Sequence, residues 1–431
     1  MNSELLNTYP KYDSYKDSRV DWLGDIPEHW NVLPLDVISK IKSISGYPNE
    51  TLLSVYLNEG VIRYNDVKEK RTNATSTNLD NYQLVDTGDF VLNNQQAWRG
   101  SVGVSSYRGI VSPAYIILEL SKSLESNFAN YIFRSEHMIY QYVIHSKGVG
   151  TIQRNLYWQS FKKSICLIPP ISEQTAIANF LDQKTIQIDQ AIDLKQQQIE
   201  RLNEYKQIII QNAVTKGLDP TAKMKDSGVS WIGNIPEEWT IEKGKWLFFK
   251  MDRPVREKDG IVTCFRDGEV TLRSNRRTEG FTNALKEHGY QGVRKGDLVI
   301  HQMDAFAGAI GVSDSDGKST PVYSVCIPKD SKRVLSKYYS YFLRSIAHNG
   351  YILSLAKGIR ERSTDFRFND FAKLELPLPP YSSQIKISEF IEQQTARINL
   401  VTDLQKQQIE RLKEYKTILI NQAVTGKIKV S

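Results

Sequence analysis

Two long stretches of the chain carry an apolar residue at close to every seventh position and contain neither glycine nor proline. The first lies between Ser172 and Gly217, and the second lies between Ser382 and Gly426. Each holds about 43 residues, which is roughly 65 Å of α-helix at 1.5 Å per residue. So narrow a stripe is typical of a long helix that packs along one seam against another helix. The stripe positions are Ile177, Leu181, Ile188, Ala191, Ile199, Leu202 and Ile209 in the first stretch, and Ile387, Ile391, Ile398, Val401, Ile409, Leu412 and Leu419 in the second.

The second half of the chain repeats the first. Asp17 to Trp30 (DSRVDWLGDIPEHW) and Asp226 to Trp239 (DSGVSWIGNIPEEW) match at 9 of 14 positions and lie 209 residues apart. QQIERLNEYK, which starts at Gln197, recurs as QQIERLKEYK from Gln407, with 9 of 10 residues identical. An offset near half the chain length indicates a tandem duplication.

Between these segments the two halves align only weakly. Gly100 and Gly103 align with Gly308 and Gly311 at an offset of 208. The residues just before them differ almost completely, because NQQAWR at 94–99 stands against QMDAFA at 302–307. The pattern predicts two similar scaffolds that present different surfaces, as two related domains with different binding targets would.

Each long helix must bury its apolar stripe against a partner, and the nearest candidate is its own copy. A parallel pair would force the domain that follows the first helix to lie beside the domain that precedes it. We therefore expect an antiparallel pair, with one domain at each end and a pseudo-twofold axis between the two repeats.

The segments between the helices have a mixed α/β pattern. Short apolar runs bounded by turn residues predict strands, and longer amphipathic runs predict helices. The expected fold class is α+β: two mixed α/β domains joined by two long helices that form an antiparallel coiled coil. The expected boundaries are 1–171 for the first domain, 172–217 for the first helix, 218–381 for the second domain, and 382–431 for the second helix and tail. Strands are expected at 90–92, 114–120, 298–300 and 322–327, and helices at 127–145 and 337–355.

Composition fits this plan and places the charge. A chain of 431 residues with 40% hydrophobic and 24% charged residues suits two or three globular domains. Of the net charge of +7, the segment 31–165 carries +3 and the segment 240–375 carries +7, whereas the two helices are close to neutral. The basic surplus therefore lies in the two variable domains, and it favours an anionic partner there.

Several kinds of chemistry find no support in the sequence. Cys166, Cys264 and Cys326 stand far apart, without a CxxC pair or clustered histidines, so we expect neither disulfides nor a zinc site. The run from Val312 to Ser319 lacks the first glycine of a phosphate-binding loop. We expect no catalytic residues and no metal ligands. Because the sequence offers no apolar leader and no run of roughly 20 apolar residues, a cytoplasmic location is the expectation.

The repeated motifs together resemble those of one protein family. They are the Trp-(Leu/Ile)-Gly-x-Ile-Pro-Glu-x-Trp segment of each half, the Pro-Pro-x-Ser-x-Gln entry to each long helix at 169–174 and 379–384, and the QQIERLxEYK stretches. Their order, spacing and duplication resemble the specificity subunit of type I restriction-modification enzymes over essentially the whole chain.

The resemblance implies a function that the composition alone does not give. In that family each half contributes a target recognition domain that recognises one half of a bipartite site in double-stranded DNA, and the paired helices set the distance between them. The subunit is not itself catalytic. Two modification subunits, which bind S-adenosylmethionine and methylate adenine, dock on it, and two restriction subunits, which use ATP and Mg²⁺, can join them. The resemblance thus implies that this chain binds no cofactor of its own.

The resemblance also implies that base contacts lie in loops of the two domains. Guanidinium groups and amides are the side-chain groups that recognise guanine and adenine edges. By position, the candidates for DNA binding are Asn94, Trp98, Arg99 and Arg154 in the first domain, and Arg273, Arg276, Gln302, Arg360 and Arg362 in the second. Trp98 and its counterpart Phe306 could equally be core residues, and Gln302 could simply cap a turn.

A second hypothesis remains open. The chain could be a duplicated scaffold that binds no DNA and assembles protein partners through its helices. Binding of random-sequence DNA by the assembled complex separates the two hypotheses. A third, an independent nuclease or methyltransferase, would require activity of the purified chain alone, and the missing motifs argue against it.

Overall fold

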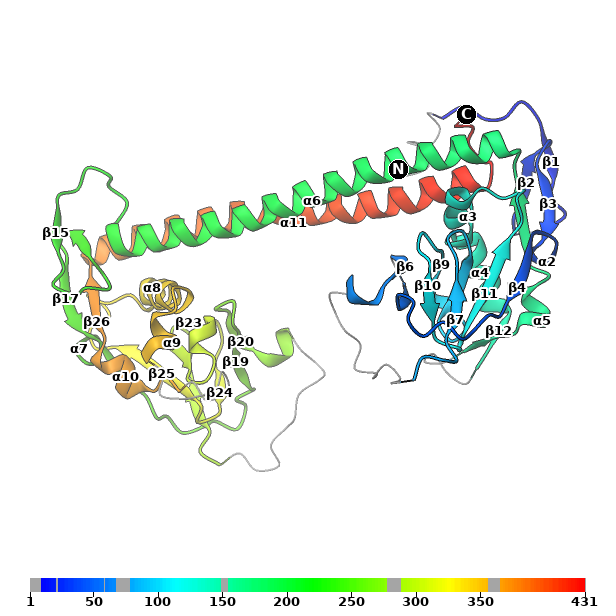
Figure 1. Ribbon diagram of the computed structural model, residues 1–431. Helices are drawn as coiled ribbons and strands as arrows, with labels where there is room; N and C mark the ends of the chain where they lie inside the picture. Colours follow the sequence, from blue (N-terminus) through cyan, green and yellow to red (C-terminus); the bar gives the residue numbers. More distant parts are fainter. Residues whose placement is uncertain are drawn as a thin grey trace. The chain divides into compact units, whose positions relative to one another are not determined.

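The computed structural model describes residues 9–20, 22–57, 59–66, 78–148, 154–276, 288–355 and 365–430. The chain divides into two compact units (Figure 1). Unit 1 comprises Met1–Lys195 together with Lys406–Ser431, and unit 2 comprises Gln196–Gln405. Two long helices, α6 (Ile171–Lys216) and α11 (Tyr381–Val424), each contribute one part to unit 1 and the other part to unit 2.

Unit 1 is built on a four-stranded antiparallel sheet in the order β4-β11-β8-β9. Its other strands form antiparallel pairs: β1-β2, β3-β14, β5-β6, β7-β10 and β12-β13. The strands are β1 (Tyr15–Asp17), β2 (Asp25–Pro27), β3 (Asn31–Pro34), β4 (Ser39–Lys42), β5 (Leu53–Tyr56), β6 (Gly60–Arg63), β7 (Gln83–Val85), β8 (Phe90–Asn93), β9 (Val102–Val104), β10 (Gly109–Val111), β11 (Tyr115–Leu120), β12 (Ser146–Lys147), β13 (Asn155–Leu156) and β14 (Ile165–Ile168). The helices are α2 (Leu35–Ile38), α3 (Ser126–Phe133), α4 (Glu136–Ile144) and α5 (Trp158–Phe161), with 3₁₀ turns η1 (Tyr64–Asp66) and η2 (Ala97–Arg99).

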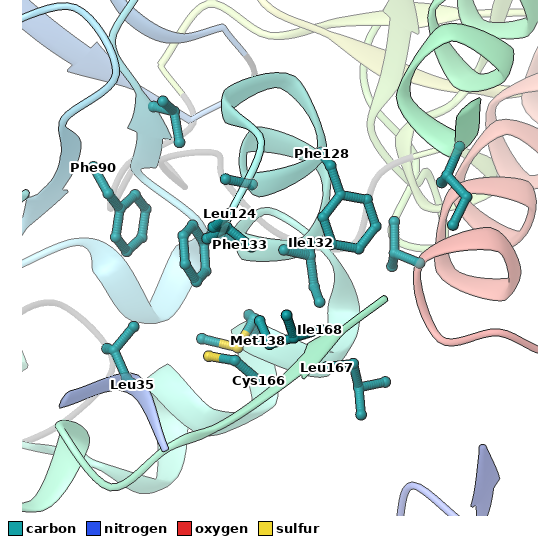
Figure 2. Close-up of a cluster of buried hydrophobic side chains, with 14 of the residues drawn as sticks. Leu35, Phe90, Leu124, Phe128, Ile132, Phe133, Met138, Cys166, Leu167 and Ile168 are labelled. Carbon is teal, nitrogen blue, oxygen red and sulfur yellow. The ribbon is translucent and has the colours of Figure 1, made fainter. Parts of the chain in front are cut away.

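The alternation of side chains along β8 gives the sheet of unit 1 two buried faces. Phe90 and Leu92 point into a core shared with α3 and α4, where the rings of Phe90 and Phe133 stack at 4.2 Å. Figure 2 shows this cluster, with Leu35, Met138 and residues of β14 among its labelled members. Val91 points the other way, into a smaller cluster with residues of β5, β6, β7 and β10. The sheet is therefore covered by helices on one face and by short strand pairs on the other.

Unit 2 repeats this architecture. Its four-stranded sheet has the order β18-β25-β22-β23, and Leu298 and Ile300 face the helices while Val299 faces the strand pairs. The strands are β15 (Met224–Asp226), β16 (Asn234–Pro236), β17 (Thr240–Lys243), β18 (Phe248–Lys250), β19 (Val262–Cys264), β20 (Val270–Leu272), β21 (Gln291–Val293), β22 (Leu298–His301), β23 (Ile310–Val312), β24 (Gly317–Ser319), β25 (Tyr323–Pro328) and β26 (Glu375–Leu378). The helices are α7 (Gly244–Leu247), α8 (Ser336–His348), α9 (Tyr351–Leu355) and α10 (Phe368–Lys373), with 3₁₀ turns η3 (Arg273–Asn275) and η4 (Ala305–Ala307).

Within each unit, α6 and α11 pack side by side in opposite directions. In unit 1 the beginning of α6, at Ile177 and Leu181, shares a core with the end of α11, at Leu419 and Ala423. In unit 2 the end of α6, around Val214, shares a core with the beginning of α11, at Ile387 and Ile391. The expected antiparallel coiled coil is confirmed, and so is the α+β class with an internal repeat.

The stripe prediction is wrong at two positions. Val401 is 42% exposed, and its neighbour Thr402 lies in the seam at 6% exposure. Likewise Ile210 is buried in the core of unit 2, whereas Ile209 is only half-buried. At 402 a polar residue takes the buried position, whereas at 208–210 three consecutive isoleucines leave the spacing unable to tell which one is most buried.

A buried glutamine attaches each long helix to its domain. The Gln174 amide donates to the carbonyls of Ser123 and Pro169 and accepts from the backbone N–H of Glu125, at 2.8–2.9 Å. Gln384 makes the equivalent three bonds with Arg333, Pro379 and Leu335. Both glutamines are fully buried, so these bonds satisfy polar groups that water cannot reach. This explains why the helix-entry motif occurs twice.

The repeated tryptophan segments pack against the far ends of the same helices. Trp30 and Trp239 are almost completely buried, and each lies near the glycine that ends a helix. A Cβ on Gly426 would lie 2.4 Å from Pro27, and one on Gly217 would lie 3.4 Å from the Trp239 ring. Both glycines have positive φ, so close approach and backbone conformation both favour glycine there.

Two predicted helices are divided in the structure. The helix expected at 127–145 breaks between α3 and α4 at Arg134 and Ser135, and the one expected at 337–355 breaks at Gly350, where φ is +79°. The three cysteines are buried free thiols, as the sequence predicts.

Candidate nucleic-acid interface

In unit 1 the structure brings three of the predicted residues together. The Arg99 guanidinium lies 4.7 Å from the centre of the Trp98 ring, and the Arg154 guanidinium lies 5.1 Å from it. The ring is partly buried against the core, and its Nε1 donates to the Gln95 carbonyl at 3.1 Å. Trp98 is thus both a packing residue and the platform for two cations.

Asn94 fixes the geometry of this cluster. Its side-chain oxygen and its backbone carbonyl both accept from the N–H of Leu156, at 3.0 and 3.1 Å. These bonds hold β13, and with it the neighbouring Arg154, against the end of β8. Gly100 then ends η2 with φ of +91°, a conformation that glycine adopts without strain. Asn94, Trp98, Arg99 and Arg154 therefore form one surface, which we call the Trp98 cluster.

Sequence reasoning missed two neighbouring side chains. The Lys147 ammonium lies 5.4 Å from the ring centre of Tyr157, which is 51% exposed. Lys147 precedes the polar loop at 148–155, at the end of β12, and Tyr157 follows it, after β13. The polar, glycine-led sequence of that loop is the feature from which both residues could have been predicted. They add a second cation and aromatic pair beside the Trp98 cluster.

In unit 2 the position equivalent to Asn94 is Gln302. Its backbone carbonyl accepts from Phe366 at 3.0 Å, much as Asn94 accepts from Leu156. Its amide nitrogen lies 3.3 Å from the Ser324 hydroxyl and 3.5 Å from the Pro321 carbonyl. In this structure the Gln302 amide therefore bonds within the fold.

Of the two predicted arginines that follow the β19-β20 hairpin, Arg273 begins η3 and Arg276 comes directly after it. Arg276 pairs with Asp267 at 2.7 Å and with Glu269 at 2.9 Å, and its guanidinium covers the Phe265 ring at 4.2 Å. The Nε of Arg273 donates to the Thr263 hydroxyl at 3.3 Å. The cationic charge of Arg276 is thus balanced locally by two carboxylates.

Arg273 is linked electrostatically to the central sheet. Burial raises the pKa of Tyr323, and the charge of Arg273 opposes that rise. Tyr323 in turn packs edge-on against His301 at the end of β22, beside Gln302. The two remaining candidates, Arg360 and Arg362, lie outside the described residues.

Equivalent positions of the two units therefore carry different chemistry. Where unit 1 has Trp98 and Arg99, unit 2 has Phe306 and Ala307, and Asp304 beside them pairs with Arg266 at 2.8 Å. One surface is cationic and aromatic, and the other mixes acidic and basic groups. Two such surfaces suit two different targets.

The described residues offer little else for chemistry. They contain no group of three or more His, Cys, Asp or Glu side chains placed to hold a metal ion.

A cavity of about 740 Å³ lies at the end of α6 in unit 2, where Gly217 and Trp239 line it together with residues at the beginning of α11. None of the helices in the described part of the chain is long and apolar enough to cross a membrane.

Comparison with known proteins finds relatives that are similar along most of the chain. No family model matches the chain. The putative type I restriction enzyme MjaX specificity subunit of Methanocaldococcus jannaschii is 22% identical over 99% of both chains. The MjaVIII specificity subunit of the same organism is 23% identical over 94% of both. The EcoBI specificity subunit of Escherichia coli is 22% identical over 67% of this chain and 64% of its own length.

Solved structures of type I restriction-modification proteins have a similar fold. A chain from a type I restriction-modification system, solved to describe complex assembly and conformational transition, superposes with a TM-score of 0.66 at 13% identity, covering 93% of this chain and 98% of its own. The HsdS subunit from Thermoanaerobacter tengcongensis gives a TM-score of 0.52 at 14% identity, covering 94% and 98%. The resemblance predicted from the repeated motifs is confirmed: over nearly its whole length the chain is similar to the specificity subunits of type I restriction enzymes.

Proposed function

We propose that this chain is the DNA-recognition subunit of a type I restriction-modification complex, and that each unit recognises one half of a bipartite site. The observation that carries the proposal is the contrast between Asn94, Trp98 and Arg99 in unit 1 and their counterparts in unit 2. The framework is repeated, whereas the exposed side chains at the same place differ in charge and in hydrogen-bonding groups. A protein that recognised one repeated feature would keep these surfaces alike.

The Trp98 cluster has the chemistry of a DNA-binding surface. Guanidinium groups recognise guanine edges and phosphates, and an aromatic ring orients them without neutralising their charge. Arg154 has no carboxylate partner among the residues that the structure describes. An anion supplied by DNA would therefore complete the cluster.

The partners we propose are two modification subunits and two restriction subunits, as the family resemblance implies. The surfaces of α6 and α11 offer sites for them. Leu194 in unit 1 and its repeat equivalent Leu404 in unit 2 are 59% and 49% exposed, and Leu400 is 63% exposed. Exposed leucines at equivalent places on two helices are suited to binding two copies of one protein.

The chemistry is then left to the partners. We propose that S-adenosylmethionine, ATP and Mg²⁺ are bound by the modification and restriction subunits, and that this chain has no catalytic residue. The prediction is that the purified chain alone neither methylates nor cleaves DNA.

One experiment tests DNA recognition and its division between the units. The full chain is produced together with its modification subunits, a pool of random duplexes is selected for binding, and methylated adenines are mapped. We expect a split motif. The double variant Arg99→Ala/Arg154→Ala should degrade recognition of one half only, by about 1 to 3 kcal/mol for each base that an arginine no longer reaches.

The matched control is Arg276→Ala, in unit 2, where two carboxylates already balance the charge. It should leave the half recognised by unit 1 unchanged. Equal weakening of both halves in the unit 1 variant would contradict the division between the units. Indifference of the whole complex to DNA would favour the protein scaffold instead.

A further inference from the structure

Each unit places one arginine at the same point of the repeat, beneath the tip of a β-hairpin. Arg134 follows α3, and Arg344 lies in α8; each is the ninth residue counted from the first residue of its helix, Ser126 or Ser336. In unit 1 the hairpin is β5-β6 and its tip holds Gly60, and in unit 2 the hairpin is β19-β20 and its tip holds Gly268.

Each glycine lies against a guanidinium group, and in unit 2 the contact is too close for any side chain. A Cβ on Gly60 would lie 3.6 Å from Nη1 of Arg134, and one on Gly268 would lie 2.4 Å from Cζ of Arg344. Both glycines have positive φ, at +77° and +87°. The arginine and the glycine therefore form one arrangement that occurs in both units, although the surrounding sequences differ.

Neither guanidinium forms a direct ion pair with a described carboxylate, although the charge of Asp267 acts on Arg344 from a longer distance. Among the residues that the structure describes, no carboxylate lies within ion-pair distance of Arg134 or Arg344. Within the described part of the chain, the Arg134 guanidinium has one hydrogen bond, to the Leu57 carbonyl at 3.5 Å, and the buried Nε of Arg344 has no partner. Burial lowers the pKa of both groups, which means that their surroundings disfavour the charge. Both side chains are half-buried, and a partly buried cation without an ion-pair partner costs free energy that a bound anion would offset.

Both arginines lie beside the segments that carry the candidate base contacts. In unit 1 the Leu57 side chain at the hairpin tip lies 3.8 Å from where a Cβ on Gly100 would stand, directly after η2. In unit 2 the Arg266 carbonyl lies 2.8 Å from the same point on Gly308, directly after η4. An anion bound at either tip would therefore lie next to the surface that differs between the units.

We propose that Arg134 and Arg344 are paired phosphate-binding residues, each contacting one backbone phosphate of DNA next to the half-site that its unit recognises. The inference rests on the proposed DNA-binding function and deepens it. Base contacts must differ between two half-sites, whereas every duplex presents the same phosphates. Arg134 and Arg344 occupy equivalent places on two surfaces that otherwise differ. This is expected of residues that contact DNA independently of its sequence.

The test measures how binding depends on salt. The full chain in complex with its modification subunits is titrated with a random-sequence duplex and with the selected target at several salt concentrations. Removing one phosphate contact reduces the slope of log K against log[salt] by about 0.9. We expect Arg134→Gln and Arg344→Gln each to lower that slope by about 1 and to weaken both duplexes about tenfold, leaving their affinity ratio unchanged.

Two controls separate binding from folding. Arg333→Gln removes an exposed arginine that pairs with Glu242 just before α8, and it should leave the slope unchanged. Arg134→Lys and Arg344→Lys keep the charge and should keep most of the slope. Should the glutamine variants fail to fold, modification of arginines by phenylglyoxal on the wild-type complex gives the same answer, because DNA should protect Arg134 and Arg344.

The outcomes are distinct. If the slope is unchanged in the glutamine variants, the phosphate role is overturned and DNA recognition is left intact. The same follows if DNA protects other arginines from phenylglyoxal but does not protect Arg134 and Arg344. A change in the affinity ratio would assign the arginines to base contacts and overturn it as well. If the wild-type complex binds neither duplex, the proposed function itself fails.

Discussion

His137 is a buried side chain on α4 whose protonation opposes folding. Its ring lies 4.6 Å from the ring of Trp22, its Nε2 lies 3.2 Å from the Ile165 carbonyl, and its buried Nδ1 has no partner among the described residues. Burial lowers the pKa of His137 to about 4, from an ordinary value near 6.5. The neutral ring is thus the form that unit 1 accommodates.

The pH dependence follows from this direction. Between pH 6.5 and 4 the unfolded chain binds a proton at this position that the folded chain does not, so stability is full above pH 6.5 and falls as the pH drops towards 4. We expect a decrease of about 3 kcal/mol over that range, measured by urea unfolding. His137→Gln should remove this part of the pH dependence, whereas His288→Gln, at an exposed position, should retain it.

At the same scale, the Trp98 cluster marks the limit of what the sequence could predict. Trp98 and Arg99 are adjacent, but Arg154 joins them only because Asn94 holds β13 against the end of β8. Position along the repeat was enough to name these four residues. It was not enough to find Arg134, because an arginine in a helical pattern looks like an ordinary surface residue until the hairpin tip is placed over it.

At the scale of elements, the two long helices were the most predictable part of the chain. Their length and stripe follow from spacing alone, but the seam also contains polar positions that spacing does not reveal. Lys416 reaches across from α11 to Asp189 at 2.6 Å in unit 1, and the equivalent pair in unit 2 is Lys206 with Asn399 at 3.2 Å. Such contacts fix which residues of the two helices face each other, as polar residues do in coiled coils.

Thr402 offers a direct test of the seam. Its hydroxyl oxygen is buried and has no hydrogen-bond partner in the part of the chain that the structure describes, a condition that costs about 1 to 3 kcal/mol. Thr402→Val keeps the shape and removes the unsatisfied group, so we expect it to stabilise unit 2 by about 1 kcal/mol in urea unfolding. The matched control is Thr185→Val in unit 1, where the hydroxyl donates to the Asp182 carbonyl at 3.2 Å. That variant should be neutral or destabilising, and equal stabilisation by both would contradict the interpretation.

At the scale of the whole molecule, the two long helices belong to both units, so their length governs the proposed spacing between half-sites. Four residues inserted in each helix, after Gln196 in α6 and after Gln405 in α11, add about 6 Å. That length corresponds to about two base pairs of duplex at 3.4 Å each. We expect the gap in the methylated site to lengthen accordingly while both half-sites stay the same.

The measurement is again a map of methylated adenines, made with the lengthened chain in its complex. In a control with the insertion in α6 alone, the apolar residues of α6 and α11 no longer face each other along the seam. That variant should lose DNA binding, and the gap between the half-sites should not simply lengthen. An unchanged gap with both insertions present would mean that the helices do not set the spacing.

The division of the chain into units has a consequence for its synthesis. Unit 2 is one continuous stretch, Gln196–Gln405, whereas unit 1 needs the final segment, Lys406–Ser431, to cover Ile177, Leu181 and Ile188. On the ribosome, unit 2 can therefore complete its fold while unit 1, although made first, still exposes half of a hydrophobic seam. The earlier part of the protein must wait for the later part, and during that interval it is the part that chaperones and proteases would encounter.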